Sequence, residues 1–297
     1  MNLIKLAWKN IVHNPLNLLL NLILLALGIG LINFILLVNH QLKDKFDKNL
    51  AGIDLVIGAK GSPLQMILSS MYHIDAPTGN IKIKEGKAFL REGHPLIKSS
   101  VPLSMGDSYK GFRIIGTDHS ILKLYNAVIS EGQLWNNVLE VTAGYEVAKA
   151  LDLKLGSKFK SSHGFNDDED LTHDEGTFKI VGILKPTGSV IDQLLLCNTQ
   201  SVWVMHDHEA MAAEENEPID DHEGHDDKTH NHAEHDHKSD MSRAHLLTYE
   251  EEEITSILIQ FSNRTNFQAL SLGRNINENT DMQAASPAIE INRLYSM

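Results

Sequence analysis

The feature that most constrains this fold is a long apolar stretch near the N-terminus. Residues 16–38 read LNLLLNLILLALGIGLINFILLV and contain no charged side chain. An α-helix rises about 1.5 Å per residue, so this stretch forms a helix of about 35 Å, enough to cross the roughly 30 Å of a hydrocarbon core. A cleaved signal peptide has a shorter apolar region, of about 7–15 residues, and ends at a small-x-small site. No such site follows at residues 36–40, so we expect an uncleaved transmembrane helix.

The segments on either side of this span are also predicted to be helical. Residues 2–13 place apolar side chains and Trp8 on one face, which predicts an amphipathic interfacial helix over residues 1–15, bent at Asn14-Pro15. After the span, Leu42, Phe46 and Leu50 repeat every four residues. We therefore expect residues 16–50 to form the transmembrane helix and a stalk. Lys5 and Lys9 before the span are compatible with a cytoplasmic N-terminus, although the lysines after it prevent a firm assignment.

Residues 51–297 alternate short apolar runs with short helical patterns, which is typical of an α+β domain. The strands expected from these runs are 53–57, 96–105, 109–116, 138–142, 157–161, 177–184, 191–197 and 254–261. The expected helices are 63–71, 85–92, 120–125, 144–151 and 266–276. We place the turn between the second and third of these strands at Gly106-Asp107-Ser108.

Composition excludes several classes of protein. The 297 residues include 26 basic and 39 acidic side chains, and the net charge of −13 argues against binding to nucleic acid. The 42% of hydrophobic residues are enough for a real core. Cys197 is the one cysteine, so no internal disulfide can form; its neighbours in Leu194-Leu195-Leu196 predict a buried thiol.

A histidine-rich acidic segment interrupts the domain. Residues 206–240 hold eight of the 16 histidines, and we expect a disordered loop over residues 206–250. Imidazole and carboxylate groups suit Zn²⁺, Ni²⁺ or Cu²⁺. The candidate metal ligands are His222, His225, His230, His232, His235 and His237, with zinc as the possible ion. The alternative is a solvated acidic loop whose histidines bind metal only incidentally.

Enzyme signatures are weak throughout the chain. No HExxH motif is present, and Gly58-Ala59-Lys60-Gly61-Ser62 lacks the full spacing of a phosphate-binding loop. We interpret this segment as a tight turn between a strand and a helix. We therefore predict that the chain is not an enzyme and binds no organic cofactor.

Several segments, in this order, resemble the MacB/FtsX-like permeases of ABC transporters. They are Lys9-Asn10-Ile11 with Asn14-Pro15 before the span, residues 51–63 (AGIDLVIGAKGSP) after the stalk, Glu146–Leu151, Leu155–Phe159, Phe178–Leu184, and Pro186-Thr187-Gly188-Ser189 with Asp192. The resemblance covers nearly all of residues 1–205 and 250–297.

The resemblance implies an α+β periplasmic core domain behind the first of four transmembrane helices, in the inner membrane. It also implies a dimer that works with a cytoplasmic ABC ATPase, which would supply all ATP hydrolysis, and a possible periplasmic partner. The chain ends at residues 291–297, about where the second span would begin, so we expect a fragment or a split gene product. No catalytic residue is implied.

Three interpretations remain open. The first is an ABC transporter permease subunit that couples ATP hydrolysis in a partner to movement of its periplasmic domain, possibly linked to metal. The second is a membrane-anchored periplasmic protein that binds or senses zinc. The third is a regulator that moves without transporting anything.

Overall fold

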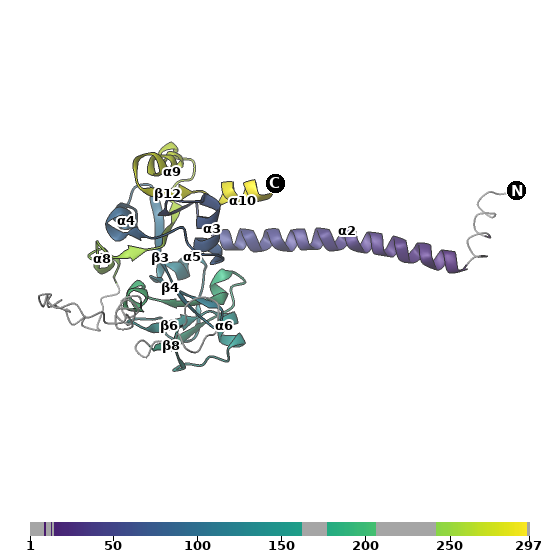
Figure 1. Ribbon diagram of the computed structural model, residues 1–297, viewed down its shortest axis with the longest axis horizontal. Helices are drawn as coiled ribbons and strands as arrows, with labels where there is room; N and C mark the ends of the chain where they lie inside the picture. The colour runs from purple at the N-terminus through teal and green to yellow at the C-terminus, as the bar shows by residue number, and fades with distance from the viewer. Residues whose placement is uncertain (1–8, 10–12, 14, 162–176, 206–241, 296–297) are drawn as a thin grey trace, which may run out of the picture. The chain divides into compact units, whose positions relative to one another are not determined.

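A computed structural model describes residues 9, 13, 15–161, 177–205 and 242–295, in two compact units, Met1–Lys48 and Asn49–Met297 (Figure 1). The predicted interfacial helix over residues 1–15 falls almost wholly outside the described residues, as do the candidate metal ligands.

The first unit consists of the long helix α2 (Pro15–Leu50), whose last two residues belong to the second unit. The predicted span and stalk thus form one continuous helix. Its most apolar window is 0% buried, and among the described residues it is the one helix long and apolar enough to cross a membrane. An apolar helix without protein packing around it is suited to lipid.

The second unit is a mixed α/β domain, as predicted. Its described helices are α3 (Pro63–Tyr72), α4 (Ile83–Leu90), α5 (Ser120–Leu124), α6 (Tyr145–Ala150), the 3-10 helix η2 (Val190–Gln193), α8 (Arg243–Leu246), α9 (Phe267–Asn279) and α10 (Pro287–Tyr295); residues 199–205 are also helical. Its described strands are β1 (Leu55–Ala59), β2 (Ile81–Lys82), β3 (Ile97–Tyr109), β4 (Phe112–Thr117), β5 (Ile129–Gly132), β6 (Glu140–Ala143), β7 (Lys158–Phe159), β8 (Phe178–Leu184), β9 (Leu194–Cys197), β10 (Glu253–Ile254), β11 (Ser256–Phe261) and β12 (Met282–Ala285).

Ten of the described strands form one mixed sheet. Nine follow the order β12-β1-β11-β3-β4-β9-β6-β8-β5, and β7 pairs with β8. The pairs β4–β9 and β6–β8 are parallel and the others antiparallel. Strands β1, β11 and β12 come from opposite ends of the domain sequence and lie next to one another at one edge of the sheet.

Local sequence signals explain the elements that were predicted well. Ser62 caps α3 by accepting a hydrogen bond from the Gln65 amide, and Pro63 occupies the first turn. The predicted turn between a strand and a helix is confirmed for residues 60–62, whereas Gly58 and Ala59 belong to β1. Strand β8 alternates buried and more exposed residues, and it pairs with β7.

Several predicted boundaries are wrong. The strand expected over residues 191–197 begins only at Leu194, because Val190–Gln193 form η2. The β3–β4 turn lies at Lys110 and Gly111, which have φ angles of 48° and 81°, and residues 106–108 belong to β3. A bulge between Met105 and Ser108 takes up the irregularity that the sequence suggested as a turn. The disordered loop predicted over residues 206–250 overlaps α8, a helix that begins at Arg243 and buries Leu246.

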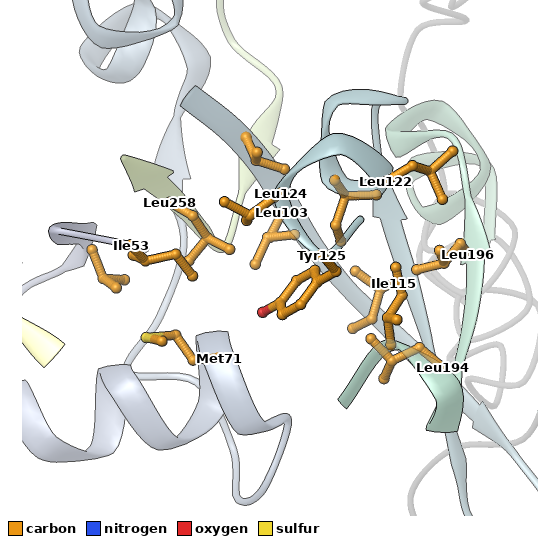
Figure 2. Packing of buried hydrophobic residues seen from close by; sticks show 14 of the residues in the cluster. Ile53, Met71, Leu103, Ile115, Leu122, Leu124, Tyr125, Leu194, Leu196 and Leu258 are labelled. Carbon is orange, nitrogen blue, oxygen red and sulfur yellow. The ribbon is translucent and has the colours of Figure 1, made fainter. Parts of the chain in front are cut away.

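The main core cluster contains residues from two halves of the sheet, β1, β11 and β3 on one side and β4 and β9 on the other. Figure 2 shows Ile53, Met71 and Leu258 on one side of Tyr125, and Ile115, Leu194 and Leu196 on the other. All of these side chains are buried. Burial raises the pKa of the Tyr125 hydroxyl, so this group stays neutral inside the cluster. Shared apolar packing makes the two halves of the sheet one cooperative body.

Candidate functional site

The chain leaves α2 and enters β1 through residues 49–54, which we call the junction. Ala51 and Gly52 have φ angles of 45° and 74°, and Ile53 N donates to Leu50 O at 2.6 Å. Left-handed backbone after the last turn is how helices commonly end, and glycine adopts it without strain. The junction is therefore a short, defined bend.

One side of the junction contacts residues 186–192, which we call the Asp192 loop. Val190 N donates to Asn49 Oδ1 at 2.8 Å. The Asp192 side chain is 4% exposed, and its carboxylate accepts from Thr187 N at 3.0 Å, Thr187 Oγ1 at 2.9 Å and Gly188 N at 2.7 Å. A buried carboxylate with this many donors holds its loop in one conformation.

The other side of the junction contacts β11 and the residues that follow it. Gln260 Nε2 donates to Ala51 O, and Arg264 donates from one terminal nitrogen to Gly52 O, both at 2.9 Å. These two bonds satisfy the carbonyl groups of the first two residues after α2, which have no partner in the helix.

Asp54 extends this second set of contacts. Its carboxylate accepts from Phe261 N at 2.8 Å and pairs with Arg264 Nε at 2.7 Å. Asp54 is itself largely buried, with 14% of its side chain exposed, whereas Arg264 is 64% exposed. The carboxylate thus serves mainly to fix the backbone of β11 against the junction.

Apolar packing completes the junction. Ile53 is buried in the main core cluster (Figure 2). Leu50 and Ala51 pack against this cluster. The junction contains no nucleophile with a neighbouring base. What it can do is mechanical: a rotation or translation of residues 49–54 must move the Asp192 loop and β11 with it, or break their hydrogen bonds.

The other predicted features are the histidine metal ligands and the buried Cys197. The ligand candidates His222, His225, His230, His232, His235 and His237 lie outside the described residues. Within the described part of the chain, no three His, Cys, Asp or Glu side chains are grouped as a metal site would require. Cys197 is fully buried, as predicted, and burial raises the pKa of its thiol to about 12.

The sequence pointed to part of the junction and to one of its two sets of partners. Residues 51–63 and the Pro186–Ser189 segment with Asp192 were singled out by resemblance. Gln260 and Arg264 were missed, because they lie about 200 residues away in sequence and form no local pattern with the junction. Asn49, a polar residue near the end of the stalk, was the available sequence signal for a contact of the junction.

Comparison with known proteins gives one family. The sequence model described as "MacB-like periplasmic core domain" matches residues 18–222, more than half of the chain. No curated protein sequence matches the chain.

Solved structures show weaker similarities. The periplasmic region of MacB from Actinobacillus actinomycetemcomitans matches with a TM-score of 0.46 and 12% identity, over 85% of this chain and 99% of that one. The extracellular domain of the noncanonic ABC-type transporter YknZ from Gram-positive bacteria gives 0.40 and 11%, over 78% and 98%. A domain of a putative permease protein from Porphyromonas gingivalis gives 0.37 and 10%, over 80% and 90%.

Proposed function

The chain belongs to the family of MacB-like periplasmic core domains of ABC transporter permeases, and from this premise we propose how it works. We propose that it is a permease subunit anchored in the inner membrane by α2, with its α/β domain on the periplasmic side. A cytoplasmic ABC ATPase, acting on a permease dimer, supplies the energy for movement of this domain. The observation that supports the proposal most directly is the junction, where the backbone that leaves α2 is bonded to two separate parts of the domain.

The junction has the properties that transmission of movement requires. The hydrogen bonds of Asn49, Gln260 and Arg264 lie on opposite sides of one short bend. Each such bond contributes about 1 kcal/mol net, and leaving a buried partner unsatisfied costs about 1–3 kcal/mol. Displacing the junction alone would break several bonds at once. We therefore expect residues 49–54 and the segments bonded to them to move together.

Hydrogen–deuterium exchange tests this proposal. The chain, in lipid nanodiscs with its partner ABC ATPase, is compared without nucleotide and after trapping with ATP and vanadate. We expect trapping to change deuterium uptake in peptides that cover residues 49–54 and 186–192. The double variant Gln260→Ala/Arg264→Ala should lose this change, because it removes the two side chains that hold the carbonyls of Ala51 and Gly52.

A matched control separates coupling from folding. Arg274 is an exposed arginine on α9 that contacts none of the junction residues, so Arg274→Ala should keep the nucleotide-dependent change. Uptake at residues 49–54 and 186–192 that is the same in both nucleotide states of the wild-type complex would contradict the proposal.

A second, metal-linked function is favoured by composition alone. We propose that the histidines between residues 222 and 237 bind Zn²⁺. Calorimetric titration of the full chain with zinc should show binding that is lost when residues 206–240 are deleted. Affinity should fall between about pH 7 and pH 5, because imidazole ligands must be deprotonated and exposed histidines titrate near 6.5. Unchanged binding after the deletion would remove the loop from this function.

A further inference from the structure

A cleft lies on the domain between the end of α4, strand β3, helix α5 and helix α8. Its volume is about 680 Å³, and it is open to solvent. Most of its lining is polar, and it includes the hydroxyl groups of Ser99, Ser100 and Ser120. Residues 49–54 of the junction do not line this cleft, but Gln260, which donates to Ala51 O, does. The site argued below does not use Gln260.

Three basic side chains reach this cleft from three different elements. They are Arg91 after α4, Lys98 on β3 and Lys123 on α5. Within the described part of the chain, none of these three forms an ion pair. The cleft also holds Glu92, which opposes them. The result is a local excess of positive charge on a chain whose net charge is −13.

The floor of the cleft is built around an internal ion pair. Arg243 Nε donates to Asp118 Oδ2 at 3.0 Å, and the guanidinium also donates to Ser100 O at 2.6 Å and Ser100 Oγ at 2.9 Å. The side chains of Arg243 and Asp118 are 16% and 18% exposed. Asp118 is thus neutralised from within the protein, and it does not offset the charge of Arg91, Lys98 and Lys123.

The ring of His119 is fixed beside this ion pair. Its Nε2 lies 2.9 Å from Trp135 O, and because a carbonyl oxygen only accepts, this nitrogen must carry the proton. The ring packs edge-on against Trp135, with centroids 4.9 Å apart. The floor is therefore preorganised, while the three free basic side chains stand at the rim.

We propose that this basic cleft binds the anionic group of a ligand, a carboxylate or a phosphate, through Arg91, Lys98 and Lys123. Arginine recognises both groups with two parallel N–H donors, and lysine adds point charge. The Ser99 hydroxyl at the cleft wall can donate to a remaining oxygen, whereas those of Ser100 and Ser120 already bond to Arg243 and Asp118. Cations from three elements converging on one cavity favour a ligand with more than one charge.

Calorimetry on the full chain in a non-ionic detergent tests the site with three probes. Sodium pyrophosphate and citrate represent soluble phosphate and carboxylate ligands, and dihexanoylphosphatidylglycerol represents an anionic lipid headgroup. We expect saturable binding of at least one probe. The triple variant Arg91→Gln/Lys98→Gln/Lys123→Gln should weaken it by about tenfold or more, because it removes every charge-assisted contact. Binding of the soluble probes assigns a soluble ligand, and binding of the lipid alone assigns a headgroup.

The matched control removes the same amount of charge elsewhere. Lys110, Lys149 and Lys158 are exposed and lie outside the cleft, so Lys110→Gln/Lys149→Gln/Lys158→Gln should bind the probe as the wild type does. Two results would overturn the proposal: no saturable binding of any probe to the wild type, or equal loss of affinity in both triple variants.

Discussion

The surroundings of His73 shift its pKa far from the value of an ordinary histidine. It follows α3 with a φ angle of 53° and is 7% exposed. Burial, and secondarily the positive charge of Arg113, lower its pKa to about 3. The folded protein therefore keeps this imidazole neutral over a pH range in which the unfolded chain, with a pKa near 6.5, takes up a proton.

This difference predicts a pH dependence of stability. Below pH 6.5 the unfolded state binds more protons at this position than the folded state, so stability falls as pH decreases toward 3. The slope from one such group reaches at most about 1.4 kcal/mol per pH unit. His73→Asn removes the titrating group, and asparagine tolerates a positive φ. Urea denaturation of both chains between pH 6.5 and 5, where most carboxylates remain ionised, should show a shallower slope for the variant. Equal slopes would mean that His73 is protonated in the folded protein.

At the scale of elements, the β3–β4 hairpin shows what local sequence can and cannot determine. Both strands were expected, but their turn was placed at Gly106-Asp107-Ser108 because those residue types favour turns. The actual turn needs two consecutive positive φ angles, and Lys110 supplies one of them at some cost. The longer strand pairing of β3 with β11 extends through residues 97–103 and helps to fix the register.

This hairpin gives a prediction of increased stability. Lys110→Asn should raise the free energy of unfolding by about 0.5–1 kcal/mol, because Asn-Gly is the preferred pair for this turn type. Thermal denaturation monitored by circular dichroism measures the change. Lys110→Val is the matched comparison, since a β-branched residue at this φ should destabilise the chain. A variant order with valine more stable than asparagine would contradict the assigned turn.

Whether another element could be predicted depended on how strong its apolar pattern is in the sequence. α2 was predictable from its uninterrupted apolar run, α3 from its Ser-Pro start, and β8 from its alternating pattern. β5 was missed because three of its four residues are exposed, and β12 because MQAA has small or flexible side chains. The parallel pairing of β4 with β9 and the partners of the junction depend on contacts between distant segments, and no local pattern encodes them.

At the scale of the whole molecule, the chain combines an apolar helix with a folded α/β domain of one family. The proposed function requires these two parts to be on different sides of a boundary: α2 in lipid, and residues 49–297 outside the cytoplasm. The stalk, the junction and the Asp192 loop have a role in transmission only if this arrangement holds. Topology is thus the premise of the mechanism, and it can be measured without knowledge of the substrate.

Cysteine labelling in spheroplasts tests this arrangement most directly. Cys197 is fully buried with a raised thiol pKa, so the wild-type chain should not react with a membrane-impermeant maleimide. Lys149→Cys places a thiol on the exposed face of α6, and Lys9→Cys places one before the span. We predict that Lys149→Cys is labelled in intact spheroplasts and Lys9→Cys only after they are permeabilised. Labelling of Lys9→Cys in intact spheroplasts, with Lys149→Cys protected until permeabilisation, would contradict the account.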